Sequence, residues 1–169
     1  MNSIPKVTIV IGLPGSGKTT YLNDHFSDRL PNGFFDDFHG GSLDGTGAFA
    51  TSRHYEALKR KLKECQDCVI SDIEYCRSER LRAAEEGLRT ISRDLGIAIE
   101  IAPLYFENNP NGCRHNVVHR FAHEGGRDYL IELLNIDDLT KVYNCPATGV
   151  VPVKSCCCKE DADHRYCPA

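Results

Sequence analysis

The chain has 169 residues and a formal net charge of −4 at pH 7, and 41% of its residues are hydrophobic and 26% charged. These values predict one globular domain with a sizeable core, and they argue against a basic surface that recruits nucleic acid. No apolar run reaches membrane-spanning length, and the short apolar run near the N-terminus leads into a glycine-rich loop. We therefore expect a cytoplasmic protein without membrane contacts.

The first predicted elements are a strand over Lys6–Ile11, a glycine-rich loop and a helix that starts near Thr19. The strand is rich in β-branched residues, which is typical of a buried parallel strand. The loop, Gly12–Thr19, fits the pattern G-x-x-x-x-G-K-[ST] in full. Its glycines allow successive amide N–H groups to curl around an anion, and the following helix offers its positive end. Pattern and context together predict a phosphate-binding site rather than a simple turn.

The residue types in this loop indicate how it would hold a nucleoside triphosphate. Lys18 is expected to reach the β- and γ-phosphates, and the Thr19 hydroxyl is expected to hold Mg²⁺. The predicted ligands are therefore ATP and Mg²⁺. The predicted nucleotide-binding residues are Gly12, Leu13, Pro14, Gly15, Ser16, Gly17, Lys18, Thr19 and Thr20.

Two further short strands, predicted over Phe34–Phe35 and Cys68–Ser71, end in acidic residues. Asp36 and Asp37 follow the first strand, and Asp72 follows the second. Because the carboxyl ends of parallel strands meet at one edge of a sheet, these acids should open on the same crevice as the loop. We expect Asp72 to hold Mg²⁺, and either Asp36 or Asp37 to take the proton of a hydroxyl acceptor. The competing interpretation is that all three acids form turns or cap helices.

The rest of the chain alternates helical and strand patterns. We predict helices over 52–65 and 78–95, a strand over 97–106, a helix opened by Asn109-Pro110, a helix over 128–134 and a weak fifth strand over 141–144. The alternation predicts an α/β fold with parallel strands, right-handed crossovers and helices on both faces of the sheet. The glycine-rich segment 40–47 is expected to be a mobile loop.

Two arginines of the helix opened by Asn109-Pro110, Arg114 and Arg120, are candidate catalytic groups. Phosphoryl transfer spreads negative charge over oxygens that a guanidinium can bind. Gly125-Gly126 is a candidate hinge, so that segment 109–127 could close as a lid. Arg120 is preferred because it lies closer to the glycine pair. The competing interpretation is a solvated helix face.

The segment 145–169 is rich in soft metal ligands, namely Cys145, Cys156, Cys157, Cys158, His164 and Cys167. Such residues could bind Zn²⁺. Their spacing lacks a paired C-x-x-C repeat, which favours free thiols. The segment also has too little apolar content for a second domain, so we predict one domain over 1–144 followed by a tail.

The sequence resembles the small P-loop kinases of the polynucleotide kinase and zeta-toxin type. The resemblance lies in the loop and Thr20, the pair Asp36 and Asp37, the segment Val69–Asp72 and the arginine-bearing helix after Leu104–Pro110. It covers roughly residues 5–130. It implies a P-loop NTPase three-layer sandwich with strand order 2-3-1-4-5. By motif position it also implies that Asp36 or Asp37 is the base and that Arg114 or Arg120 is the lid arginine.

The resemblance implies Mg-ATP-dependent transfer of a phosphoryl group to a hydroxyl. The sequence therefore predicts a kinase acting on a small molecule, a nucleoside or nucleotide, or a nucleic-acid 5′ end. Nucleic acid is the less favoured acceptor because the net charge is negative. The alternative prediction is a nucleotide-binding switch or accessory ATPase that acts on a partner protein.

Overall fold

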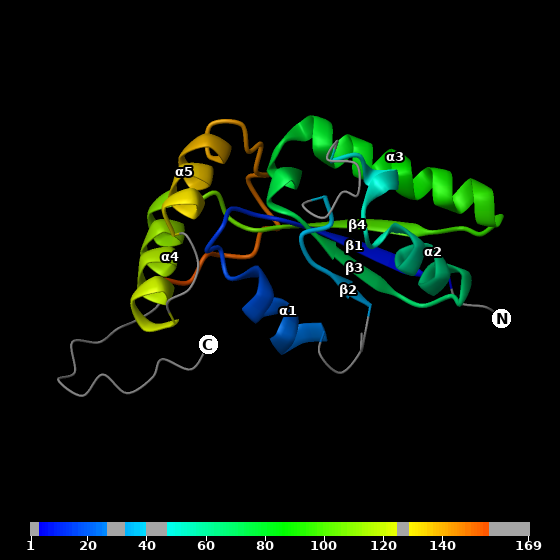
Figure 1. Ribbon diagram of the computed structural model, residues 1–169, viewed down its shortest axis with the longest axis horizontal. Helices are drawn as coiled ribbons and strands as arrows, with labels where there is room; N and C mark the ends of the chain where they lie inside the picture. The colour runs from blue at the N-terminus through cyan, green and yellow to red at the C-terminus, as the bar shows by residue number, and fades with distance from the viewer. Residues whose placement is uncertain (1–3, 27–32, 40–46, 125–128, 156–169) are drawn as a thin grey trace.

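The computed structural model describes residues 4–26, 33–39, 47–124 and 129–155 (Figure 1). In chain order its elements are β1 (Lys6–Ile11), α1 (Lys18–Phe26), β2 (Phe34–Phe35), the 3-10 helix η1 (Phe49–Thr51), α2 (Tyr55–Lys63), β3 (Cys68–Ser71), the 3-10 helix η2 (Ile73–Cys76), α3 (Ser78–Leu95), β4 (Glu100–Tyr105), α4 (Pro110–Glu124) and α5 (Tyr129–Leu139).

The strands form one parallel sheet in the order β2-β3-β1-β4. This order and the alternation with helices confirm the predicted α/β fold. In the register, Ile9 of β1 lies between Ile70 of β3 and Pro103 of β4. All three strands that precede the predicted site residues therefore run in the same direction and end at the same edge of the sheet.

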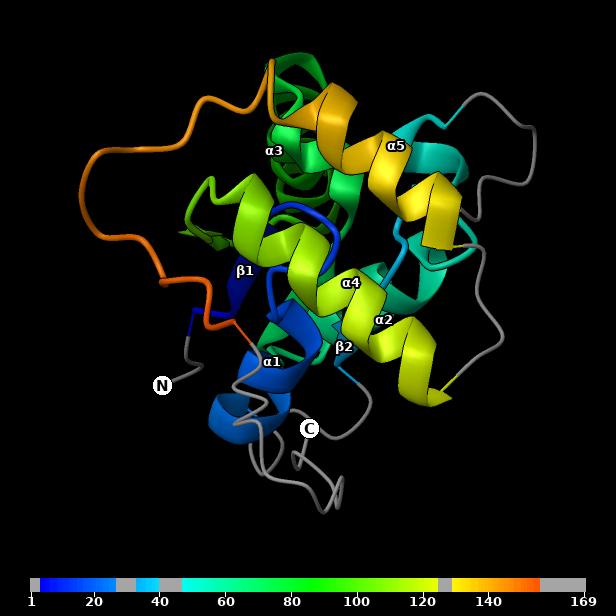
Figure 2. The same ribbon diagram turned by 90° about the vertical axis from the view of Figure 1, so that its left-hand side faces the viewer.

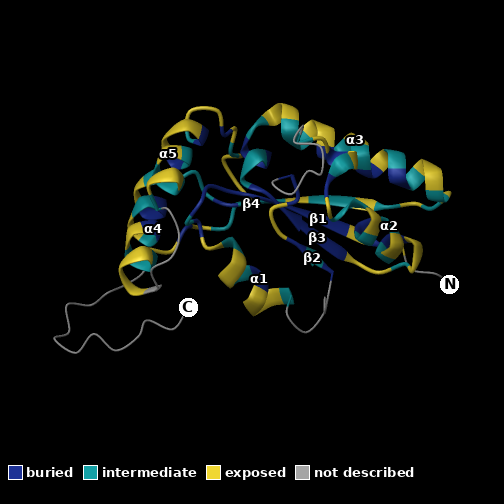
Figure 3. Cartoon of the chain, in the orientation of Figure 1, coloured by how far each residue is buried: buried dark blue, intermediate teal, exposed yellow. Residues whose placement is uncertain are grey.

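Helices cover both faces of the sheet (Figure 1). On one face, Ile9 and its alternate neighbours pack with Leu58 and Leu62 of α2 and Leu88 of α3. On the other face, Val10 packs with Leu22 of α1. The central strands are buried on both sides, whereas β4 is partly exposed (Figure 3). Continuous apolar runs in β1 and β3 are the sequence counterpart of this two-sided burial.

The predicted fifth strand over 141–144 is wrong. After α5 the chain turns, with the amide N–H groups of Val142 and Tyr143 both donating to the carbonyl of Leu139. Tyr143 is buried, and its hydroxyl donates to the carbonyl of Phe106. Its aromatic side chain thus serves packing rather than strand pairing. Beyond it, Val151 forms a single parallel bridge with Phe106 at the end of β4.

Helices α4 and α5 lie side by side at the carboxyl-end edge of the sheet (Figures 1 and 2). The predicted N-cap of α4 is confirmed, because the side-chain oxygen of Asn109 accepts a hydrogen bond from the Gly112 amide at 3.0 Å. Helix α5 extends beyond the predicted 128–134. The predicted Gly125-Gly126 break and most of the predicted mobile loop 40–47 lie outside the described residues.

In the part of the chain that the structure describes, no helix has both the length and the apolar character needed to cross a bilayer.

Candidate functional site

The loop Gly12–Thr19 joins the end of β1 to the start of α1. Gly15 and Gly17 have φ angles of 74° and 86°, which residues with a Cβ rarely adopt. A Cβ at Gly12 would lie 2.8 Å from both the Phe106 Cβ and the Ser16 Oγ. The loop is therefore a tightly wound turn whose path depends on its glycines.

The side chain of Lys18 points into the loop. The Lys18 ammonium donates to the carbonyls of Gly12 and Leu13, both at 2.9 Å. Burial lowers the pKa of Lys18, and the nearby negative charges of Asp36 and Asp72 act in the opposite direction. The Lys18 ammonium thus sits at the centre of the loop within electrostatic reach of two predicted acids.

The Ser16 Oγ is buried and has no hydrogen-bond partner. A buried hydroxyl without a partner is costly, so it marks a place where a polar ligand atom would be favourable. Thr19 and Thr20 lie in the first turn of α1 and are exposed.

Asp72 is buried at the end of β3, where its carboxylate accepts hydrogen bonds from backbone amides. The His39 amide donates to one oxygen at 2.7 Å, and the Glu74 amide donates to the other at 2.8 Å. The second bond caps η2, which is the structural role that sequence reasoning kept as an alternative. Each carboxylate oxygen can accept more than one bond, so capping is compatible with the predicted contact to Mg²⁺.

Asp36 and Asp37 follow β2, and both are exposed. They differ in backbone conformation and in the charges they act on. Asp37 has a φ angle of 49°, the left-handed conformation of a tight turn. Asp36 is the member of the pair whose charge acts on Lys18. The backbone of Asp36 also makes a hydrogen bond with His54, whose own pKa is lowered by burial and by the charge of Arg53.

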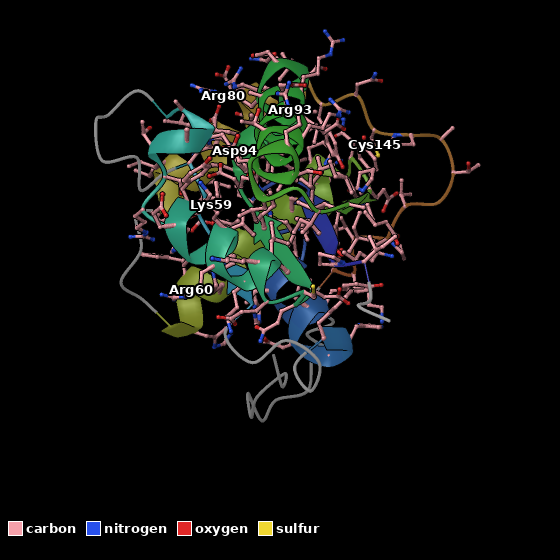
Figure 4. All side chains as sticks on the ribbon, turned by 90° about the vertical axis from the view of Figure 1, so that its right-hand side faces the viewer. Lys59, Arg60, Arg80, Arg93, Asp94 and Cys145 are labelled. Atoms are coloured by element: carbon pink, nitrogen blue, oxygen red, sulfur yellow. The ribbon has the colours of Figure 1, made fainter. Side chains whose placement is uncertain are left out.

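Several residues that hold this region together carry no local sequence signal. The Ser52 Oγ donates to the carbonyl of Phe38 at 2.5 Å, and the His39 Nδ1 lies 2.8 Å from the carbonyl of Gly47. Arg80 of α3 donates to the same carbonyl at 3.0 Å (labelled in Figure 4). The residues after β2 thus form hydrogen bonds with elements that are distant in sequence. This distance explains why the sequence did not predict these contacts.

Helix α4 packs directly on the loop. A Cβ at Gly15 would lie 2.5 Å from the carbonyl oxygen of Cys113 and 2.8 Å from a methyl group of Val117. The amide of Asn116, another residue that the sequence reasoning missed, donates to the carbonyls of Gly15 and Lys154, both at 2.9 Å. Close packing and hydrogen bonds together fix one side of the loop.

The two predicted lid arginines both contact α5. Arg114 pairs with Asp137, and Arg120 pairs with Glu132. Arg120 follows Cys113 by seven residues, so the two lie on one side of α4, and Cys113 contacts the loop at Gly15. That contact is made by the backbone carbonyl of Cys113, whereas the side chain of Arg120 extends to Glu132 of α5.

Among the predicted tail ligands, only Cys145 belongs to the described residues. Its thiol donates to the carbonyl of Phe106 at 3.4 Å (labelled in Figure 4). Cys156, Cys157, Cys158, His164 and Cys167 lie outside the described part. Within the described ranges, no three or more His, Cys, Asp or Glu side chains are grouped to hold a metal ion.

Replacing Gly15 with alanine is expected to lower the free energy of unfolding by more than replacing Gly17. Both substitutions put a Cβ on a left-handed backbone, which costs on the order of 1–2 kcal/mol. Only the Gly15 Cβ would also meet α4, since nothing lies within 4 Å of a Cβ at Gly17. Urea denaturation of the two variants measures the difference. Equal losses would show that α4 does not pack tightly on the loop.

The fold and site thus define an α/β protein whose parallel sheet presents a glycine loop, a lysine and acidic residues at one edge. No family model matches the chain. The uncharacterized protein R277 of Acanthamoeba polyphaga mimivirus is 31% identical over 115 residues, which span 68% of this chain and 72% of that protein. The chain belongs to the same family as this viral protein. Membership by itself assigns no activity.

Proposed function

We propose that the protein is a P-loop kinase that transfers the γ-phosphate of Mg-ATP to a hydroxyl group. The observation that carries this proposal is the meeting of the loop Gly12–Thr19, the Lys18 ammonium and the carboxylates of Asp36 and Asp72 at one edge of the sheet. A glycine-wound loop at a helix start with an adjacent lysine suits phosphates. The order β2-β3-β1-β4 also agrees with the first four positions of the strand order that this class implies.

The described residues fit a bound triphosphate. The left-handed backbone at Gly15 and Gly17 allows the loop to turn its amide N–H groups toward one anion. Phe106 and α4 pack closely against Gly12 and Gly15 and hold the loop in this path. The unpartnered Ser16 hydroxyl offers a hydrogen bond to the same ligand. Loop amides and Lys18 would hold the phosphates, and Thr19 and Asp72 would hold Mg²⁺. The ion, when bound, would neutralise charge on the phosphate oxygens.

Asp36 is the better candidate for the base. It shares the electrostatic environment of Lys18, which would bind the phosphates, whereas the left-handed turn at Asp37 favours a structural role. The Asp36 carboxylate would take the proton of the acceptor hydroxyl. Among the arginines, Arg120 is the better candidate for contacting the transferred group, because it lies closer to Gly125-Gly126, the predicted hinge. That contact requires Arg120 to exchange its ion pair with Glu132 for phosphate oxygens.

A panel of hydroxyl acceptors tests the proposal. The purified protein would be incubated with Mg-ATP and with nucleosides, nucleotides, sugars or 5′-hydroxyl oligonucleotides, and ADP and phosphorylated products would be measured by mass spectrometry. We expect ADP to form with one acceptor class together with the matching phosphorylated product. ADP formation that ignores every acceptor and rises with a partner protein would instead support the nucleotide switch.

A further inference from the structure

His39 and Tyr75 each bury a polar side-chain atom that has no hydrogen-bond partner among the residues that the structure describes. The unpartnered atoms are the His39 Nε2 and the Tyr75 hydroxyl oxygen. Both residues are almost fully buried, with relative exposures of 4% for His39 and 1% for Tyr75. Their rings pack edge to face with centroids 5.1 Å apart. Buried polar atoms are rarely left unpaired because each one costs free energy, so this pair calls for a polar ligand.

The pair is held against Asp72, the proposed ligand of Mg²⁺. The His39 amide donates to the Asp72 carboxylate at 2.7 Å, and the Tyr75 amide donates to the Asp72 carbonyl at 3.2 Å. His39 also follows the proposed base, Asp36, by three residues. The pair therefore adjoins the part of the site where our proposed function puts the acceptor rather than the nucleotide.

The second nitrogen of His39 determines what this pair can recognise. The His39 Nδ1 lies 2.8 Å from the carbonyl oxygen of Gly47, which can only accept a hydrogen bond, so Nδ1 carries a proton. In the neutral ring Nε2 then has a lone pair and can only accept, whereas the Tyr75 hydroxyl can both donate and accept. A ligand hydroxyl suits both atoms because it donates to Nε2 and accepts from Tyr75. A phosphate or carboxylate oxygen has no proton to offer Nε2.

We propose that His39 and Tyr75 bind a hydroxyl group of the acceptor other than the one that is phosphorylated. The acceptor is accordingly a polyhydroxylated small molecule, such as a sugar or a ribonucleoside, and the pair determines specificity for it. The role of this ligand as acceptor rests on the proposed kinase function. Its binding to His39 and Tyr75 does not require turnover and can be measured separately.

The first test is a titration of the full chain, labelled with ¹⁵N at histidine, with D-ribose, D-glucose, glycerol and uridine, each with and without Mg-ADP. Long-range ¹H–¹⁵N spectra report both nitrogens of every imidazole, and His39→Asn assigns the His39 signals. We expect a proton on Nδ1 alone at mildly alkaline pH, and a shift of the Nε2 signal with at least one compound. A proton on Nε2 in the free protein, or an Nε2 signal unmoved by all four compounds, would overturn the proposal. Phosphoryl transfer plays no part here, so a failed kinase assay leaves this result readable.

The second test compares two variants by ligand-observed NMR with the compound that shifts Nε2. Tyr75→Phe removes only the hydroxyl oxygen, and His39→Asn keeps an N–H donor as many bonds from the backbone as Nδ1 but removes Nε2. Each should bind the compound about 3–10-fold more weakly, the effect of one hydrogen bond. Tyr105→Phe, in β4, is the matched control and should bind as the wild type does. Wild-type binding in both Tyr75→Phe and His39→Asn would overturn the proposal.

Urea denaturation of Tyr75→Phe separates ligand binding from a structural role. Because the hydroxyl is buried without a partner, its removal should leave the urea midpoint unchanged or raise it. A lower midpoint would show that the hydroxyl already has a partner in the free protein, such as a buried water, and would overturn the proposal.

Discussion

Replacing Lys18 with methionine is expected to lower Mg-ATP affinity and the rate of phosphoryl transfer by on the order of 10²–10³-fold, the effect of removing one preorganised charge-stabilising donor. The Lys18 ammonium is held inside the loop by the carbonyls of Gly12 and Leu13. In our proposal it exchanges these contacts for phosphate oxygens. Calorimetric titration with Mg-ATP and steady-state kinetics with the best acceptor measure the two effects.

The same substitution should leave the fold intact. Methionine removes two hydrogen bonds to carbonyls, each worth about 1 kcal/mol, and it also removes the cost of burying an ammonium group. We therefore expect the free energy of unfolding at pH 7 to change by no more than about 1 kcal/mol. Lys63→Met, at an exposed position of α2, is the matched control and should leave binding unchanged. Wild-type affinity in Lys18→Met would contradict the proposed role.

The lowered pKa of Lys18 also has a consequence for stability. Because burial lowers the pKa in the folded state, the unfolded state binds more protons between that lowered pKa and the ordinary value of 10.5. Stability attributable to this group therefore rises as the pH increases through that interval. The rise should be missing in Lys18→Met, which a comparison of urea midpoints across alkaline pH would reveal.

Replacing Asp36 with asparagine is expected to lower kcat by on the order of 10²–10⁴-fold, the usual contribution of a general base. Asparagine keeps the size of the side chain and loses the ability to take a proton. Mg-ATP affinity should remain close to that of the wild type, because in our proposal Asp36 contacts the acceptor rather than the phosphates. Steady-state kinetics at saturating Mg-ATP separates kcat from nucleotide binding.

Asp37→Asn is the matched variant for this prediction. Asparagine tolerates the left-handed conformation observed at Asp37, so the turn should survive and kcat should fall by far less than in Asp36→Asn. If Asp37→Asn were the slower enzyme, the roles of the two acids would be reversed. If both variants kept wild-type kcat, neither acid would be the base.

Local signals predicted much of the fold. The bounds of β3 and α3 agree with the sequence prediction, because a β-branched run marks the strand and helical periodicity ending at Gly96 marks the helix. Gly96 has a φ angle of 63°, as a left-handed C-cap requires. The N-cap at Asn109 was likewise predictable, since capping depends on neighbours within one turn.

Long-range packing accounts for what could not be predicted. Asn116 bonds to Gly15 across 101 residues, and His39 bonds to Asp72 across 33. No pattern of nearby residues reports such pairs. Tyr143 shows the opposite error, because an aromatic residue beside Val142 suggests a strand. In the structure the Tyr143 hydroxyl donates a hydrogen bond to the carbonyl of Phe106, and the side chain is part of the packing. Capping by Asp72 was foreseen only as an alternative.

The most direct test of the central claim is a titration of ¹⁵N-labelled protein with Mg-ATP, followed by amide chemical shifts. If the loop is a phosphate cradle, the amides of Gly12–Thr19 should show the largest shifts and saturate with one nucleotide per chain. Loop amides that stay unchanged at millimolar Mg-ATP, or shifts confined to other parts of the chain, would contradict nucleotide binding by this loop.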